Sequence, residues 1–167
     1  TSVDQIKFNP DINLIQAIGK DIDDQYLADI HTLSLDPEAD KRNKDMKIVY
    51  TPIHGTGSRL MFDSLRIWGF ENVIHVPEQD VQSGDFPTVV SPNPENPEAM
   101  TMGIAKAKEV GASLVLASDP DADRIGCVVR DKEGNYQLLN GNQIVSLLLY
   151  YIISQNVEKK LLNGNEY

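Results

Sequence analysis

Cysteine is almost absent from this sequence, since Cys127 is the only one among 167 residues. A single cysteine cannot form a disulfide within the chain, so a disulfide-stapled scaffold is excluded and a reducing compartment, the cytoplasm, is expected. Long apolar runs are also lacking. The longest, from Ile144 to Ile153, is interrupted by Ser146 and is shorter than the roughly 20 residues that span a bilayer. The sequence therefore predicts no membrane partner.

Basic residues are scarce as well. The chain has 15 Lys and Arg against 25 Asp and Glu, which gives a formal net charge of −10. This balance argues against a nucleic-acid partner or an anionic membrane surface. It is compatible with a phosphorylated small substrate, because one arginine and one metal ion can reverse the local sign of the potential. With 41% hydrophobic residues, the chain is long enough for one domain with a sizeable core.

Strand and helix signals alternate through the middle of the chain. This alternation predicts a three-layer α/β/α domain with a mixed, mainly parallel sheet. The expected strands are 47–51, 72–76 and 113–118, followed by a hairpin of 125–130 and 136–140. Between the strands we expect a helix over 58–68 and a second helix that starts at the cap Asn96 and ends at Gly111.

The flanking segments carry weaker patterns. Residues 1–20 are expected to form a connector with a short extended stretch at 14–18, and a helix is predicted to open at Asp21 as its N-cap. Residues 35–46 are expected to be a linker. A last helix near Asn142 is apolar over more of its surface than one exposed amphipathic helix needs, so we expect it to pack against something else.

The segment Asp119-Pro120-Asp121-Ala122-Asp123-Arg124 is the strongest functional signal. It follows a predicted buried strand, and ligands of open α/β sheets bind beyond the carboxyl ends of strands. In an extended chain Asp119 and Asp123 would lie roughly 13 Å apart, so the segment must curl if they are to share one ion. Mg²⁺ prefers carboxylate oxygens, and an arginine suits a phosphate oxygen. A plain solvated acidic turn is the simpler alternative. An EF-hand is excluded, because arginines stand where its loop needs Gly and the bidentate Glu (Arg124 and Arg130).

Two further segments are candidates for the same site. The turn over 51–58 contains two glycines ahead of a predicted helix, which could offer backbone N–H groups to an anion. It is not a dinucleotide fingerprint, because Leu60 stands where the third Gly belongs. His54 in this turn is either a catalytic or a hydrogen-bonded structural residue. The long segment 77–95 is either a substrate contact or a rigid cover on an interface.

These pieces occur in an order that resembles one known family. The segments Thr51-Pro52-Ile53-His54-Gly55-Thr56-Gly57, Asp85 to Val89, Pro92-Asn93-Pro94-Glu95, Asp119 to Arg124 and Gly141-Asn142-Gln143 are similar to the second domain of the α-D-phosphohexomutases, the phosphoglucomutase/phosphomannomutase family. The resemblance covers roughly residues 10–160. Pro120 and Ala122 stand where many members have glycines, which favours the phosphoglucomutase/phosphopentomutase arm.

The resemblance implies an intramolecular phosphotransferase. Members have four domains, and an enzyme phosphoserine exchanges phosphate with a sugar phosphate that is converted between its 1-phosphate and 6-phosphate. By this resemblance Asp119, Asp121 and Asp123 are ligands of the cofactor Mg²⁺. Arg124 is expected to neutralise or orient the phosphate, and His54 is a second catalytic candidate.

The resemblance also predicts a domain organisation. Residues 1–40 would be a connector and helix, 41–141 the second domain with its metal loop, and 142–167 a helix leading towards a third domain. The serine, sugar and phosphate loops of domains I, III and IV find no match in this sequence, so we expect a fragment without mutase activity whose partners are those domains. Two other classes remain open here: a haloacid-dehalogenase-like phosphatase with Asp119 as nucleophile and Asp121 as acid/base, and a non-catalytic metal-binding or interaction domain.

Overall fold

Five strands form one mixed sheet in the order β2-β1-β3-β4-β5. The computed structural model describes residues 2–162. β1 pairs in parallel with both β2 and β3, whereas β4 is antiparallel to β3 and to β5. Four strands therefore run in one direction and only β4 is reversed, as the predicted mixed, mainly parallel sheet requires. The strands are β1 (Ile48–Thr51), β2 (Val73–His75), β3 (Leu114–Ser118), β4 (Ile125–Arg130) and β5 (Tyr136–Leu139).

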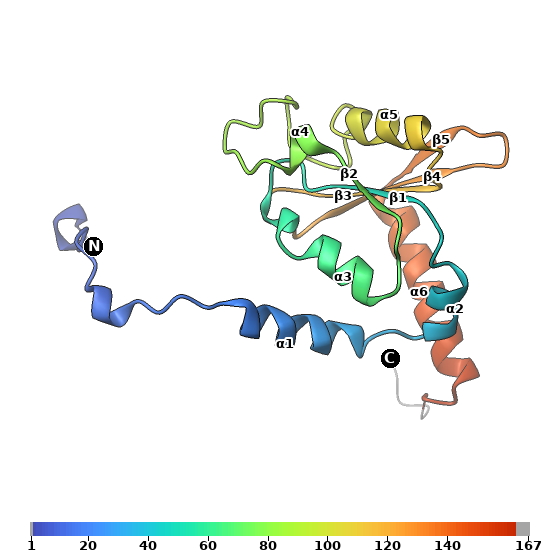
Figure 1. Cartoon of the computed structure of the whole chain (residues 1–167), viewed down its shortest axis with the longest axis horizontal. Helices are drawn as coiled ribbons and strands as arrows, with labels where there is room; N and C mark the ends of the chain where they lie inside the picture. The colour runs from blue at the N-terminus through green and yellow to red at the C-terminus, as the bar shows by residue number, and fades with distance from the viewer. Residues whose placement is uncertain (1, 163–167) are drawn as a thin grey trace.

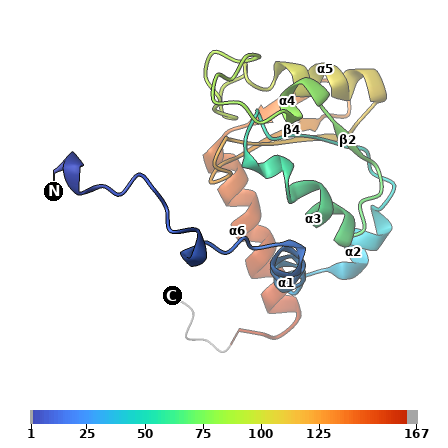
Figure 2. The same ribbon diagram turned by 60° about the vertical axis from the view of Figure 1, so that its left-hand side comes forward.

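Helices cover both faces of this sheet (Figure 1). α5 packs on β1 and β3 on one face, while α3 lies on the other face and contacts α1. Figure 2 shows the same layers from a second direction, with α6 on the side of α3. The α-helices are α1 (Lys20–His31), α2 (Pro37–Arg42), α3 (Met61–Ile67), α4 (Pro77–Asp80), α5 (Thr101–Val110) and α6 (Gly141–Glu158), and the 3₁₀ turns are η1 (Val3–Gln5), η2 (Ile12–Leu14) and η3 (Thr56–Ser58).

The core is built around β1, whose four residues are all buried. Successive side chains of a strand point to opposite faces of the sheet. Val49 accordingly belongs to the apolar cluster under α5, and Tyr50 belongs to the cluster under α3. In the second cluster the rings of Tyr50 and Phe62 meet edge to face, with centroids 5.1 Å apart. Both layers therefore depend on the strand that leads into the 51–58 turn.

The predicted strands and the hairpin are confirmed to within about a residue, but two predicted helices start too early. The helix expected from Ser58 begins at Met61, because Thr56–Ser58 forms a separate 3₁₀ turn. The helix expected from Asn96 begins at Thr101, because the residues before it form successive turns. In these turns a backbone N–H donates to the carbonyl oxygen three residues earlier. Gly111 ends α5 in the left-handed conformation, with φ +68°, as expected.

Two predictions for the less regular segments, the cap of the first helix and the linker 35–46, are wrong. α1 is preceded by Gly19 as its N-cap rather than by Asp21, which lies in the first helical turn. Ile15 has the extended backbone expected for the stretch at 14–18, although no strand of the sheet forms there. The predicted linker 35–46 contains α2, because the Asp36 carboxylate accepts a hydrogen bond from the Ala39 N–H and so caps a helix that Pro37 opens. The segment 77–95 contains the one-turn helix α4.

α6 is a well-capped helix with little cover. The side chains and backbone N–H groups of Asn140 and Gln143 satisfy each other in a capping box. No residue of α6 is buried, and its apolar side chains are largely exposed, including Leu147, Tyr150 and Ile153. Within residues 2–162, none of the helices combines the length and the apolar character that crossing a membrane would require.

Candidate metal centre

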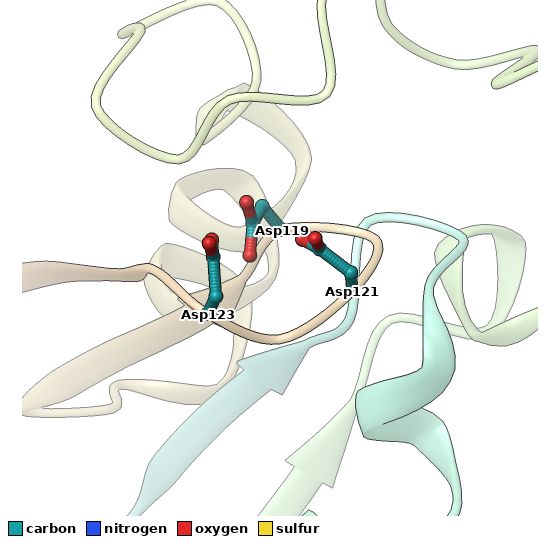
Figure 3. Close-up of side chains that lie close together, drawn as sticks. All are labelled: Asp119, Asp121 and Asp123. Carbon is teal, nitrogen blue, oxygen red and sulfur yellow. The ribbon is translucent and has the colours of Figure 1, made fainter.

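The three aspartates lie together in the loop between β3 and β4 (Figure 3). The curl that the sequence requires comes from a turn in which the Ala122 N–H donates to the Asp119 carbonyl oxygen at 3.0 Å. Ala122 adopts the left-handed conformation, with φ +60°. As a result, Asp119, Asp121 and Asp123 each place a carboxylate oxygen within 4.8 Å of the other two.

This donor set fits a hard cation. Two oxygens on opposite sides of one Mg²⁺ lie about 4.2 Å apart, because each bond is about 2.1 Å long. Oxygens already within 4.8 Å of one another need only a small side-chain movement to reach that separation. Asp119 is buried, and both Asp121 and Asp123 are exposed, so the loop combines one fixed carboxylate with two adjustable ones.

Arg124 fixes the buried carboxylate. Its backbone N–H donates to Asp119 Oδ1 at 3.0 Å, and its side-chain Nε lies 3.0 Å from Asp119 Oδ2. The same Nε lies 3.5 Å from Asp123 Oδ1. The Asp119 side chain is 2% exposed whereas that of Arg124 is 56% exposed. The guanidinium therefore reaches solvent from a position beside the carboxylates, where it can meet an anionic ligand.

The turn over 51–58 touches the acidic loop directly. The Thr56 N–H donates to the Pro120 carbonyl oxygen at 2.8 Å, and the Thr56 hydroxyl donates to the same oxygen at 3.1 Å. Gly55 lies so close that a Cβ atom on it would stand 2.4 Å from the Pro120 Cα. These contacts confirm the prediction that both loops lie on one edge of the sheet, and they explain why a glycine is needed at position 55.

A pocket of about 430 Å³ lies over this contact. Its wall includes Thr56, Asp119, Asp121 and Arg124, together with the segment 91–93. The prediction that residues 85–95 lie near the acidic loop is therefore confirmed. Ser91 and Asn93 add neutral polar groups to a pocket whose charged residues are carboxylates and one arginine.

His54 is not part of the wall of this pocket, but it contributes to a neighbouring pocket of about 320 Å³ that shares Thr56 and Pro120 with it. It is 3% exposed, and both ring nitrogens have partners: Nδ1 lies 2.8 Å from the Val81 carbonyl oxygen and Nε2 lies 2.8 Å from the Thr88 hydroxyl. The sequence analysis missed Gln79 and Thr88, which connect to this histidine. A polar residue such as Gln79 that is completely buried (0% exposed) can only be recognised once the fold is known.

Comparison with known proteins gives the family. The sequence pattern of the phosphoglucomutase/phosphomannomutase alpha/beta/alpha domain II matches residues 24–134, well over half of the chain. The chain belongs to the phosphoglucomutase/phosphomannomutase family. The acidic loop, the 51–58 turn and the segment 85–95 all lie inside the matched range. Family membership supersedes the phosphatase alternative of the sequence analysis.

Individual relatives agree with this assignment. A phosphoglucomutase of Staphylococcus epidermidis is 37% identical over 144 residues, which cover 86% of this chain and 26% of that protein. A phosphomannomutase of Mycoplasmoides pirum is 32% identical over 155 residues, which cover 93% of this chain and 28% of that protein. The crystal structure of a phosphoglucomutase/phosphomannomutase family protein from Burkholderia thailandensis shares the fold, with a TM-score of 0.58, 23% identity, and coverage of 81% of this chain and 26% of that one. The chain thus spans about a quarter of the length of the relatives it matches.

Proposed function

We propose that this chain is the magnesium-binding domain of a cytoplasmic phosphosugar mutase, which interconverts the 1-phosphate and 6-phosphate of a sugar through an enzyme phosphoserine. The observation that carries the proposal is the cluster of Asp119, Asp121 and Asp123 at the carboxyl end of β3, inside a domain of this family. The relatives named phosphoglucomutase and phosphomannomutase support a sugar phosphate as the substrate class.

Each residue of the loop has a proposed role. Asp119, Asp121 and Asp123 would hold Mg²⁺, which when bound supplies Lewis-acid stabilisation to phosphoryl oxygens. The planar guanidinium of Arg124 carries two or more N–H donors that match phosphate oxygens, and it is already exposed beside the carboxylates. Since three carboxylates alone would repel an anionic substrate, Arg124 supplies the charge that admits one.

The remaining parts of the reaction would come from the neighbouring domains I, III and IV. The sequence contains no match to the family's phosphoserine, sugar or phosphate loops. Positioning of the reacting groups can be worth about 7–11 kcal/mol of the barrier. A chain with the metal loop but without the positioning loops should therefore fold and bind metal weakly, yet show no measurable turnover.

Magnesium titration tests the metal role. We expect weak Mg²⁺ binding by calorimetry, abolished in Asp121→Asn and retained in the control Asp45→Asn, whose side chain is exposed on the segment before β1. Binding that survives Asp121→Asn would place the metal elsewhere.

A coupled assay from glucose 1-phosphate to glucose 6-phosphate, with the bisphosphate primer and Mg²⁺, tests the proposal that the other domains are needed. We expect no turnover by the folded chain. Turnover that disappears in Asp121→Asn would show that this chain is a complete enzyme.

A further inference from the structure

A continuous chain of hydrogen bonds crosses the interior beneath the metal loop. The Ile53 N–H donates to Thr51 Oγ1 at 3.1 Å, and the Thr51 hydroxyl donates to Gln79 Oε1 at 2.7 Å. The Gln79 amide donates through Nε2 to Thr88 Oγ1 at 3.1 Å. The Thr88 oxygen then lies 2.8 Å from His54 Nε2, where the chain reaches the histidine.

The partners in this chain determine the form of His54. The Val81 carbonyl oxygen can only accept, so His54 Nδ1 carries a proton and donates it. The Thr88 hydroxyl already accepts from Gln79 and has one proton of its own to give, so Nε2 is its acceptor. With the proton on Nδ1, each ring nitrogen has a partner of the opposite kind. Because both nitrogens are engaged and the residue is buried, His54 has no free site for proton exchange with a substrate.

The backbone of His54 is tied to the same segment. Its N–H donates to the Gln79 carbonyl oxygen at 2.8 Å, and its carbonyl accepts from the Ser83 N–H at 3.1 Å. Together with the two ring contacts, four hydrogen bonds join this one residue to the segment 79–88. Ile53 and His54 both have positive φ, +45° and +63°, a conformation that β-branched isoleucine strongly disfavours. Such a backbone persists only where the surrounding contacts impose it.

The residues that follow His54 are the ones that touch the metal loop. Thr56 donates twice to the Pro120 carbonyl oxygen, and Pro120 lies between two of the three aspartates. Gly55 packs against Pro120 with no room for a side chain. A shift of His54 would therefore be transmitted through two residues to the loop that carries Asp119 and Asp121.

We infer that His54 is a positioning residue: through its hydrogen bonds to Val81 and Thr88 it holds the 51–58 turn against Pro120, and so sets the spacing of the metal-binding aspartates. Of the two readings of His54 that the sequence left open, catalytic or structural, this inference takes the structural one, and it rests on the proposed function for the part that concerns metal. Two amide protons report on it without metal. The Thr56 N–H reports on the contact with Pro120, and the Arg124 N–H, which donates to Asp119 Oδ1, reports on the metal loop itself.

The test is amide hydrogen exchange of the whole chain without metal, followed by Mg²⁺ titration. In His54→Ala we expect the Thr56 and Arg124 amides to exchange about tenfold faster, while amides of β1 and β3 are unchanged, because two buried hydrogen bonds are lost locally. Mg²⁺ affinity should fall about tenfold, as is common when a group that orients metal ligands is removed. His31→Ala, at the exposed end of α1, is the matched control. Its amide exchange rates and Mg²⁺ affinity should equal those of the wild type.

The conservative variant His54→Asn separates positioning from general stability. The asparagine amide can replace Nδ1–H as the donor to Val81, and asparagine tolerates a left-handed backbone. We expect it to restore most of the Thr56 protection and Mg²⁺ affinity that His54→Ala loses. Equal losses in both variants would overturn the positioning role.

Two other outcomes would also overturn it: unchanged Thr56 exchange in folded His54→Ala, or faster Thr56 exchange with unchanged Arg124 exchange and Mg²⁺ affinity. If His54→Ala does not fold, Thr88→Val removes the hydroxyl donor at nearly constant shape. The positioning role then requires the Thr56 and Arg124 amides to exchange faster in Thr88→Val, with the amides of β1 and β3 unchanged. Failure of the wild type to bind Mg²⁺ would refute the metal proposal alone, because the exchange measurements still test the contact between the turn and the loop.

Discussion

Arg124 holds Asp119 from two sides, with its backbone N–H on one carboxylate oxygen and its side-chain Nε on the other, both at 3.0 Å. The two residues are five positions apart, so this pair closes the acidic loop on itself. Asp119 is thereby fixed in a single orientation at the end of β3. Within the described chain, Asp121 has no comparable hydrogen bond and is exposed. Asp119 is thus held in place by hydrogen bonds within the loop, whereas Asp121 is not.

The difference predicts that substitutions at Asp119 and Asp121 have unequal effects on stability and similar effects on metal binding. In Asp119→Asn the new amide would present its NH₂ group to either the N–H or the Nε–H of Arg124, so one of these two donors loses its partner at a buried side chain. We expect a loss of about 1–3 kcal/mol in the free energy of unfolding. Asp121→Asn should change stability by less than about 0.5 kcal/mol. Urea unfolding without metal measures both, and equal destabilisation by the two variants would contradict the distinction. Both variants should abolish Mg²⁺ binding.

Arg124 also repels a cation that approaches the loop. Replacing it by glutamine removes a positive charge 3.0 Å from Asp119 and 3.5 Å from Asp123. We expect Arg124→Gln to tighten Mg²⁺ binding roughly threefold to tenfold, a modest effect because the guanidinium is half exposed and screened by solvent. Calorimetry at low and high salt measures it, with Arg130→Gln at the far end of β4 as the control. Weaker binding in Arg124→Gln would mean that the arginine organises the loop more than it repels the ion.

The contact of Gly55 with Pro120 is a second route to the metal loop. A methyl group at position 55 would stand 2.4 Å from the Pro120 Cα, which requires the turn and the loop to separate. We expect Gly55→Ala to keep the α/β fold, as judged by circular dichroism, and to lose about tenfold in Mg²⁺ affinity. Gly84→Ala is the control, because a Cβ there meets nothing within 4 Å. Normal Mg²⁺ affinity in Gly55→Ala would show that the loop tolerates the displacement.

Much of the fold could be predicted from local sequence. The strands were recognisable because short apolar runs end at turn residues, and α5 ends at Gly111 for the conformational reason that the sequence suggests. The predicted starts of helices were less accurate, because more than one residue near the start of a helix can serve as its N-cap. The turns formed by residues 96–100 use the same Asn and Pro that open many helices, so the local sequence does not distinguish the two.

The candidate site, like the fold, could be predicted only in part from the sequence. The spacing of Asp119, Asp121 and Asp123 predicted that their side chains would lie close together at the end of a buried strand, and the structure brings their carboxylate oxygens within 4.8 Å of one another. Their role as metal ligands stays a proposal. The support beneath the acidic loop could not be predicted. Gln79 and Thr88 lie in a segment without periodicity, and their importance comes from burial against His54 rather than from any local pattern.

Tyr50 predicts how the stability of the whole domain depends on pH. Burial raises the pKa of Tyr50 to about 12, although its hydrogen bond to Ser118 at 2.7 Å opposes part of that shift. The unfolded chain would ionise near pH 10. Since the folded state disfavours the phenolate, the stabilisation is complete below about pH 10 and is lost as the pH rises towards 12. By pH 12 the free energy of unfolding should have fallen by about 2 kcal/mol.

Urea unfolding between pH 8 and pH 12 measures this dependence, and comparison of variants assigns it. Tyr50→Phe should be less stable at pH 8, because the Ser118 hydroxyl loses its partner, yet should show a much smaller decline above pH 10. Tyr150→Phe is the matched control, because that side chain is 75% exposed on α6 and should leave the wild-type profile intact. Tyr50 also packs against the 51–58 turn: a Cβ on Gly57 would stand 2.2 Å from its hydroxyl oxygen and 2.5 Å from Ser118 Oγ. The same decline in Tyr50→Phe as in the wild type would assign the alkaline transition to another group.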